Sequence, residues 1–366
     1  MPSDRLCSVV VIMGLCAACM TLPAGCTGGA GDRGPGDAAA LPHWTFDSSM
    51  IFPDDSSLVR PEDGVALADG RLIVADQVHG LRRIELDGTS APFGEMVAAG
   101  YLHRPPEHSG GANGVSLEPG GTHLLVTDVF HGGIYRVEVA TGATERVYQH
   151  RYGVNAAVRD SRGAIWFTQS AHNTPEDGEA RMWAAVETAG AEGALLRLGM
   201  QDGRLATQAE LILDSLAFAN GLAMDEASGH LYLAEIVAGR VLRYRVDLTT
   251  GRLSERSVFV DSLGVDNLEL DGAGHLWMAV PMGNELVVAS TTTGALHSVF
   301  RVQTPAQRER AAEITRRGET GEPRLELFTP DLWAPLPGFV TGVIVSPGSG
   351  PVYLTGLGNA LVRLSR

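Results

Sequence analysis

Residues 219–246, ANGLAMDEASGHLYLAEIVAGRVLRYRV, contain the pattern that decides the fold. An amide and a glycine, Asn220-Gly221, begin a short apolar run that ends before the turn residues Ser228-Gly229. Two further runs rich in apolar residues follow, at 230–235 and 241–246. Short apolar and β-branched runs separated by glycine-containing turns are typical of antiparallel strands joined by hairpins. The segment therefore predicts a small meander of strands.

The same pattern recurs six times along the chain, and each copy begins with a residue that carries a side-chain oxygen. The copies begin at residues 63, 113, 155, 220, 266 and 341, so their starts are 50, 42, 65, 46 and 75 residues apart. Radial β architectures use about 40–50 residues per blade, and packing blades around an axis buries the faces that a single meander leaves exposed. We therefore predict an all-β, six-bladed β-propeller. An open β-sandwich and two smaller β domains are the alternatives.

Parts of the chain fall outside this repeat. Insertions near 170–195 and 300–335 explain the two long intervals. Within the second, residues 305–322 are rich in Arg and Glu and lack a β pattern, which predicts a short helix or solvated loop with charge pairing. The extended segment 44–52 precedes the first copy, and we expect it to add a strand to the last blade and close the ring. The propeller is thus predicted to span residues 44–366.

The charged residues exclude several functions. All 28 basic residues are arginine, against 43 acidic residues, and the net charge is −15. Without lysine, the chain has no Schiff-base lysine, no phosphate-loop lysine and no lysine general base. A strongly acidic surface also disfavours contacts with nucleic-acid phosphates. We expect a monomer with a small-molecule partner and no nucleic-acid partner.

The beginning of the chain resembles an export signal. Residues 6–20 are apolar but too short for a comfortable membrane span. The sequence Leu22-Pro23-Ala24-Gly25-Cys26 resembles a bacterial lipobox, which predicts a signal peptide over 1–26, a lipid on Cys26 and a location in the cell envelope. The alternatives are a plain signal, giving a secreted or periplasmic protein, and a retained anchor. Residues 27–43, rich in Gly, Asp, Pro and Ala, predict a flexible tether.

Cysteines contribute nothing to the predicted propeller. The chain's four cysteines are Cys7, Cys16, Cys19 and Cys26. A disulfide framework in the folded part is therefore excluded.

The residues that begin the six copies form a column of side-chain oxygens. They are Asp63, Asn113, Asn155, Asn220, Asp266 and Thr341, and Glu62 precedes the first. In a propeller these positions converge at one mouth of the central channel. Carboxylate and amide oxygens without His or Cys favour a hard cation such as Ca²⁺ over Zn²⁺, and another divalent cation is the alternative. Taken singly, each residue could also simply begin a strand or form a turn.

Three groups of segments carry a resemblance to a known superfamily. They are Arg60-Pro61-Glu62-Asp63-Gly64, then Phe218-Ala219-Asn220-Gly221-Leu222 with Leu231-Tyr232-Leu233-Ala234-Glu235, and Val265-Asp266-Asn267-Leu268 with Leu276-Trp277. Over roughly residues 45–366 they resemble the six-bladed propellers of SMP-30-type gluconolactonases, paraoxonase-type arylesterases and strictosidine synthase-like proteins. This resemblance implies a catalytic Ca²⁺. Its ligands would be Glu62, Asn155, Asn220 and Asp266, with Asn267 added in the paraoxonase-like pattern.

The sequence departs from those relatives at several positions. Ala156 stands where a further Asp would be expected beside Asp63 for a second, structural calcium. Asn113 stands where paraoxonase-like enzymes have a catalytic His, and His131 lies near the position of that residue's partner. The Glu that strictosidine synthase uses has no counterpart in the sixth copy, so that chemistry is not predicted.

The oxygen column and the resemblance together indicate a calcium-dependent hydrolase that acts on a lactone or an ester at the channel mouth. We expect Asp266 to act as ligand and base, with His131 or His172 as weaker candidates for proton transfer. No Gly-x-Ser-x-Gly motif occurs, so a serine-hydrolase route has no support. The alternative is a non-catalytic exported propeller that binds a ligand or partner and contains a structural calcium. In that case Trp183 and Trp333, in the insertions, are candidates to line a pocket.

Overall fold

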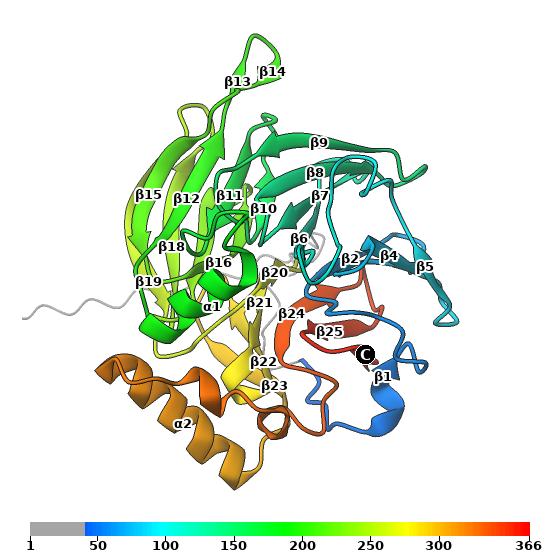
Figure 1. Cartoon of the computed structure of the whole chain (residues 1–366), viewed down its shortest axis with the longest axis vertical. Coiled ribbons are helices and arrows are strands. Elements are labelled where there is room, and N and C mark those ends of the chain that lie inside the picture. Colours follow the sequence, from blue (N-terminus) through cyan, green and yellow to red (C-terminus); the bar gives the residue numbers. More distant parts are fainter. Residues whose placement is uncertain (1–40) are drawn as a thin grey trace, which may run out of the picture. The chain divides into compact units, whose positions relative to one another are not determined.

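The computed structural model describes residues 41–366, which form six four-stranded antiparallel sheets arranged as propeller blades (Figure 1). The innermost strands of neighbouring blades contact one another around the channel. The predicted all-β, six-bladed fold is therefore confirmed. The predicted signal peptide, Cys26 and most of the tether lie outside the described residues.

The blades are numbered along the chain, and their strands are given from the channel outward. Blade 1 contains β2 (Gly64–Ala66), β3 (Leu72–Asp76), β4 (Gly80–Ile84) and β5 (Ser90–Pro92). Blade 2 contains β6 (Ala112–Leu117), β7 (His123–Asp128), β8 (Gly133–Glu138) and β9 (Thr144–Gln149). Blade 3 contains β10 (Ala157–Arg159), β11 (Ile165–Gln169), β12 (Gly193–Leu198) and β15 (Glu210–Leu216). A small hairpin of β13 (Met200–Gln201) and β14 (Arg204–Leu205) extends from blade 3.

The second half of the ring has the same construction. Blade 4 contains β16 (Ala219–Asp225), β17 (His230–Glu235), β18 (Arg240–Asp247) and β19 (Arg252–Val260). Blade 5 contains β20 (Leu268–Leu270), β21 (His275–Val280), β22 (Glu285–Ser290) and β23 (Leu296–Arg301). Blade 6 contains β24 (Val340–Val345), β25 (Val352–Gly356), β26 (Leu361–Leu364) and β1 (Ile51–Phe52).

The hydrophobic core is divided into clusters that lie between neighbouring blades. Between blades 1 and 2, for example, Ile73 and Leu81 pack with Leu124 and Val126, all almost completely buried. Corresponding clusters fill each of the other blade interfaces around the ring. Each blade thus buries both faces against its neighbours, which explains why the strands are apolar on both sides.

The beginning of the described chain closes the ring. In β1, Ile51 and Phe52 pair antiparallel with Val362 and Leu361 of β26. Earlier in the same segment, the backbone N–H of Trp44 donates to Val299 O of blade 5 at 2.8 Å. The expected closing strand from segment 44–52 is therefore present, although it is shorter than that segment.

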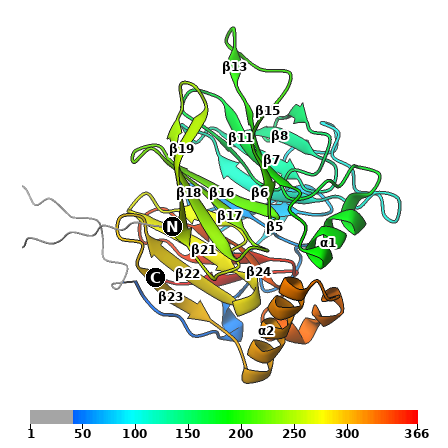
Figure 2. The same ribbon diagram turned by 90° about the vertical axis from the view of Figure 1, so that its left-hand side faces the viewer.

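Both insertions contain a helix. In the first, α1 (Gly178–Thr188) lies between β11 and β12, and in the second, α2 (Pro305–Thr320) lies between β23 and β24. A capping box of Thr304 and Gln307 begins α2, and Gly321 ends it with a φ of 71° that favours glycine. Of the two alternatives predicted for residues 305–322, a short helix or a solvated loop, the structure shows the helix. Figure 2 shows both helices on the same side of the blades.

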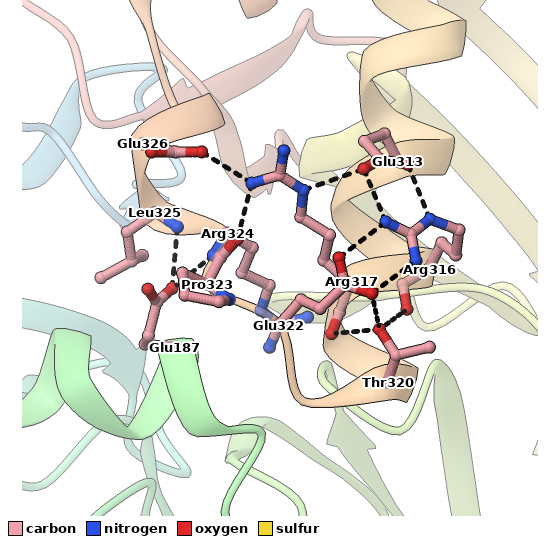
Figure 3. A network of polar contacts seen from close by, with 10 residues as sticks. All are labelled: Glu187, Glu313, Arg316, Arg317, Thr320, Glu322, Pro323, Arg324, Leu325 and Glu326. Atoms are coloured by element: carbon pink, nitrogen blue, oxygen red, sulfur yellow. Dashed lines mark hydrogen bonds and ion pairs between the residues drawn. The ribbon is translucent and has the colours of Figure 1, made fainter.

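Charge pairing dominates the exposed side of α2, as the sequence predicted. Arg316 pairs with Glu313 and Glu322, and Arg317 pairs with Glu313 and Glu326 (Figure 3).

Among residues 41–366, no helix has the length and apolar character required to cross a membrane.

Candidate functional site

A cavity of about 510 Å³ opens at one mouth of the channel. One buried polar side chain from each blade contributes to its lining at the channel end, and we call this set the floor. The floor consists of Glu62, Asn113, Asn155, Asn220, Asp266 and Thr341. The structure thus brings five of the six predicted column positions together, with Glu62 in place of Asp63.

Local backbone irregularities direct several floor side chains into the cavity. The register shifts between Ala112 and Val115 and between Ala219 and Leu222, so that Asn113 and Asn220 lie within bulges of their inner strands. A third register shift, between Val340 and Gly342 at the start of β24, places Thr341 within a bulge as well. Because a bulge changes the direction of a side chain, these irregularities explain how polar residues at strand starts turn toward the channel axis.

Glycines after the floor residues allow neighbouring blades to approach closely. The N–H of Gly114 donates to Asn155 O at 3.1 Å, and the N–H of Gly221 donates to Asp266 O at 3.0 Å. A Cβ on Gly221 would lie 2.6 Å from that same oxygen. The recurring oxygen-glycine pair in the sequence therefore has a packing cause at these positions.

Threonines on the second strands hold the backbone of the floor residues. Thr127 donates to Asn155 O at 2.6 Å, and Thr168 donates to Asn220 O at 2.7 Å. Thr355 donates to the backbone oxygen of Glu62 at 2.6 Å. Each hydroxyl crosses from one blade to the next, so the backbones of Asn155, Asn220 and Glu62 are each held by a neighbouring blade.

Two floor residues support the others through hydrogen bonds. Asn113 donates through Nδ2 to Asn155 O at 3.1 Å and to Asn155 Oδ1 at 3.3 Å. Thr341 donates to Glu62 Oε2 at 2.8 Å. Both therefore orient the amide or carboxylate beside them.

Several buried polar atoms around the floor have no hydrogen-bond partner. They are Asn220 Oδ1, Asp266 Oδ1 and both side-chain polar atoms of Asn267. Buried oxygens without a partner are costly, and a cation ligated by them would remove that cost. Three of these atoms are carboxylate or amide oxygens, the ligand type that Ca²⁺ prefers. The residues present therefore fit a hard divalent cation.

The raised pKa values of the two floor carboxyls also favour a bound cation. Burial raises the pKa of Glu62 to about 7, against the opposing effects of the Thr341 hydrogen bond and the Arg60 charge. Burial and the nearby Glu62 raise the pKa of Asp266 well above its usual range, partly offset by Asn220. Two carboxyls in one dry site resist ionising together, and a cation between them would reverse that effect.

The acid count at the floor is low. Within residues 41–366, no group of three or more His, Cys, Asp and Glu side chains is placed to hold a metal ion. The predicted ligand set contains two carboxylates, and its remaining members are amides. A cation here would depend on neutral oxygens for a large part of its coordination.

Other predicted site residues lie outside the cavity lining. Asp63 accepts a hydrogen bond from the N–H of Val115 at 2.9 Å, so its carboxylate is directed toward blade 2. Asn267 is buried next to Asp266 but does not line the cavity. Burial lowers the pKa of His131, but the hydrogen bond and charge of Asp128 raise it more, for a net increase. His131 and the exposed His172 both lie outside the lining.

The walls of the cavity could not be predicted from the repeat. They combine residues from α1, α2 and the loops that leave the blades, and most are apolar. Prominent among them are Phe130, Met182, Trp183, Val186, Phe218, Ile236, Ile314, Phe328 and Phe339. Trp183 thus lines the cavity, whereas Trp333 lies behind the wall, with its ring 4.5 Å from that of Phe339.

Arg60 is a cationic wall residue that the sequence did not single out. Its Nη1 donates to Glu179 Oε1 of α1 at 2.8 Å, and its guanidinium lies 5.9 Å from the Phe130 ring. Glu179 Oε1 also accepts from Trp183 Nε1 at 3.1 Å. Arg60 therefore connects the floor region to the first insertion helix.

A comparison with family models now identifies the central part of the chain. Residues 143–315 match the SMP-30/Gluconolactonase/LRE-like region. The resemblance to SMP-30-type gluconolactonases is confirmed for this part of the chain. The matched SMP-30/gluconolactonase-like segment contains Asn155, Asn220 and Asp266, while Glu62 lies before it.

Solved structures with this fold include SMP-30/gluconolactonase-like proteins. A gluconolactonase from Xanthomonas campestris is 19% identical with a TM-score of 0.54, over 84% of this chain and 85% of that one. A calcium-binding protein, regucalcin, from Agrobacterium tumefaciens is 15% identical with a TM-score of 0.57, over 88% of this chain and 94% of that one. At these identities the similarity shows the shared fold.

A curated relative covers a smaller part of the chain. The adipocyte plasma membrane-associated protein Hemomucin of Drosophila melanogaster is 27% identical over 180 residues. This match covers 45% of this chain and 29% of that protein. The chain therefore spans less than a third of the length of this relative.

Proposed function

We propose that this protein is a metal-dependent hydrolase that opens a lactone or cleaves an ester at the propeller mouth, with Ca²⁺ as the metal. The observation that carries the proposal is the convergence of buried, unpartnered oxygens of Asn220 and Asp266 on the floor of the cavity. A volume of about 510 Å³ is in the range of small-molecule sites. The match to a gluconolactonase-like family model supports the same reaction class.

The chain's own residues have distinct roles in this proposal. Glu62, Asn155, Asn220 and Asp266 would hold the cation, and Asn267, with a buried Oδ1 that has no partner, is an additional candidate ligand. A divalent cation supplies polarisation of a carbonyl and a lower pKa for water. Asp266 is assigned the proton of the attacking water, because it is a floor carboxylate whose buried Oδ1 has no hydrogen-bond partner in the protein. His131 is the weaker candidate, acting from outside the lining.

The reaction is tested with the full chain and a panel of aryl esters and lactones, with Ca²⁺ and then with a chelator. We expect turnover that disappears on chelation, and a loss of at least about a hundredfold in Asp266→Asn. Asp261→Asn is the matched control, since Asp261 is an exposed acid at the cavity rim. Turnover that persists under chelation, or in Asp266→Asn, would refute the proposal. A melting temperature that falls on chelation without any turnover would instead support a non-catalytic propeller with a structural calcium.

We also propose that the protein is exported and held in the cell envelope through a lipid on Cys26. The apolar run at 6–20 and the lipobox-like sequence before Cys26 support this. In a bacterial host, wild-type protein is expected in the membrane fraction with incorporated fatty acid. Cys26→Ser is expected to lose both, and equal membrane recovery of the two proteins would contradict the proposal.

A further inference from the structure

We propose that the cavity selects lactones or esters with an apolar substituent and disfavours polyhydroxylated sugar lactones. The reaction rests on the proposed function, whereas the binding preference follows from the cavity walls alone. The residues argued to determine it are Trp183 and Val186 of α1, together with Ile314 of α2.

Polar and apolar groups occupy separate parts of the cavity. The floor holds the carboxylates and amides, where a carbonyl would be placed. At the rim, Asp261, Ser262 and Glu319 are exposed to solvent. Between floor and rim, the apolar side chains of both helices and of the blade loops make up most of the wall. A bound molecule therefore needs one polar end and an apolar remainder.

Several polar side chains in the wall are already engaged. Arg324 is buried and donates through Nε and Nη2 to Val186 O, with the Nε contact at 3.0 Å. Thr315 donates its hydroxyl to Ala311 O at 3.1 Å, within its own helix. Arg60 is paired with Glu179. Hydroxyls of a sugar lactone would have to compete for these groups, and hydroxyls left unpaired in a dry wall weaken binding.

The polar edge of the Trp183 side chain is satisfied by Glu179, which is not part of the cavity lining. Its Nε1 donates to Glu179 Oε1, which leaves the ring as an apolar surface. The ring belongs to a cluster with Met182, Phe130 and Phe218, all buried cavity residues. An alkyl or aryl group placed there would exchange water for aromatic and aliphatic contacts.

The two helices are joined to each other, and α2 is also joined to the loop that leads to β24. Glu187 Oε2 of α1 accepts from the backbone N–H groups of Arg324 and Leu325, each at 2.8 Å, beyond the end of α2 (Figure 3). At the other end of α2, Gln307 Nε2 donates to Asp331 O at 2.8 Å and to Ala334 O at 2.6 Å. These contacts fix the wall before any substrate arrives, so its apolar character is a property of the unliganded cavity.

The first test measures binding without turnover. Full-length Asp266→Asn with Ca²⁺ is titrated with γ-decanolactone and with D-glucono-1,5-lactone, followed by calorimetry and tryptophan fluorescence. Each buried methylene is expected to tighten binding by about fourfold, so γ-decanolactone should bind at least about a hundredfold more tightly than the sugar lactone. Equal or tighter binding of the sugar lactone would overturn the inference.

Wall variants supply the second test. Val186→Thr keeps the shape of the side chain and adds a hydroxyl to the wall, so γ-decanolactone binding should weaken by about three- to tenfold. Val258→Thr makes the same change at an exposed position of β19 outside the lining and should have no effect. Trp183→Ala should weaken binding by at least about tenfold. Unchanged binding in folded Val186→Thr and Trp183→Ala would refute the role of these wall residues.

Turnover separates this inference from the proposed function. For wild-type protein, kcat/KM should rise with acyl-chain length in straight-chain p-nitrophenyl esters until the cavity is filled. Turnover of glucono-1,5-lactone in preference to alkyl lactones would leave the hydrolase proposal intact and refute the substrate class. If no lactone or ester is turned over, the hydrolase proposal fails, and the binding comparison alone decides whether the wall selects apolar ligands.

Discussion

The stability of the metal-free protein should depend on pH because of the floor carboxyls. Glu62 is 6% exposed, and burial raises its pKa from 4.5 to about 7. Between these pH values the folded protein retains a proton that the unfolded chain has released. The free energy of unfolding therefore falls as pH rises through this window. A difference of about 2.5 pH units corresponds to a loss of at most about 3 kcal/mol from this one group.

Other titratable groups also contribute to the pH dependence of the free energy of unfolding. Burial also raises the pKa of Asp63 to about 7 and that of Glu269 to about 8, so both act in the same direction. The raised pKa of His131 adds stability at low pH that is likewise lost as pH rises. Burial lowers the pKa of His150, which acts in the opposite direction near neutral pH. The contribution of Glu62 is therefore obtained from a variant rather than from the wild-type curve alone.

The assay is denaturant unfolding of the full chain with a chelator at about pH 5 and about pH 7.5. Wild-type protein should be less stable at the higher pH, and Glu62→Gln should reduce that difference by up to about 3 kcal/mol. Glu210→Gln, at an exposed acid of β15, is the control and should leave it unchanged. Ca²⁺ should restore stability mainly at the higher pH, where it meets ionised carboxylates. Metal-free stability that rises between the two pH values, or an unchanged difference in Glu62→Gln, would refute this account of the floor.

Two further changes test the supports of the site. Gly221→Ala should destabilise the protein by about 1–3 kcal/mol in denaturant unfolding, because the added Cβ meets Asp266 O at 2.6 Å. Gly190→Ala, with no contact closer than 3.5 Å, is its control, and equal effects of the two would contradict the packing argument. Arg324→Met should cost about 1–3 kcal/mol in melting experiments, because it leaves Val186 O without its side-chain donors. Arg308→Met, at an exposed residue of α2, should be nearly neutral, and a neutral Arg324→Met would show that this contact does not stabilise the wall.

The blades could be predicted because their signal is local and repeated. Each hairpin requires only its own alternation and turn residues, such as Ser228-Gly229, where Gly229 has a φ of 71°. Ring closure was also predictable, because a propeller needs a partner for its last blade. The sequence predicted that an oxygen from each blade reaches the mouth, and five of those six positions do line the cavity.

The exact composition of the floor depends on backbone detail that the pattern does not contain. In blade 1, β2 pairs with β3 from Gly64 onward without a register shift. Asp63 consequently faces the backbone of blade 2, and Glu62 takes the place at the mouth. Blades 2, 4 and 6 instead have bulges at the equivalent point. Neighbouring acids cannot be assigned to one face until the bulges are known.

The residues of the cavity walls could not be predicted from the sequence for another reason. They are built from the two insertions and from loops of several blades, which meet through contacts across long sequence separations. Arg324 and Val186 are 138 residues apart, and neither belongs to a periodic pattern. The sequence identified Trp183 as a candidate but could not distinguish it from Trp333, which packs behind the wall.

The way the ring is closed has a consequence for the order of folding. Trp44 Nε1 donates to Ser365 O across 321 residues, and the short β1 strand pairs with the last strand of the chain. Blades 1 to 5 take their strands from adjacent segments of the chain, whereas blade 6 gains its outer strand β1 only after β26 has been synthesised. Contacts of such long range form late and slowly. Until β26 is available, β1 has no partner strand, and an unpaired strand of this kind can pair with another chain and promote aggregation.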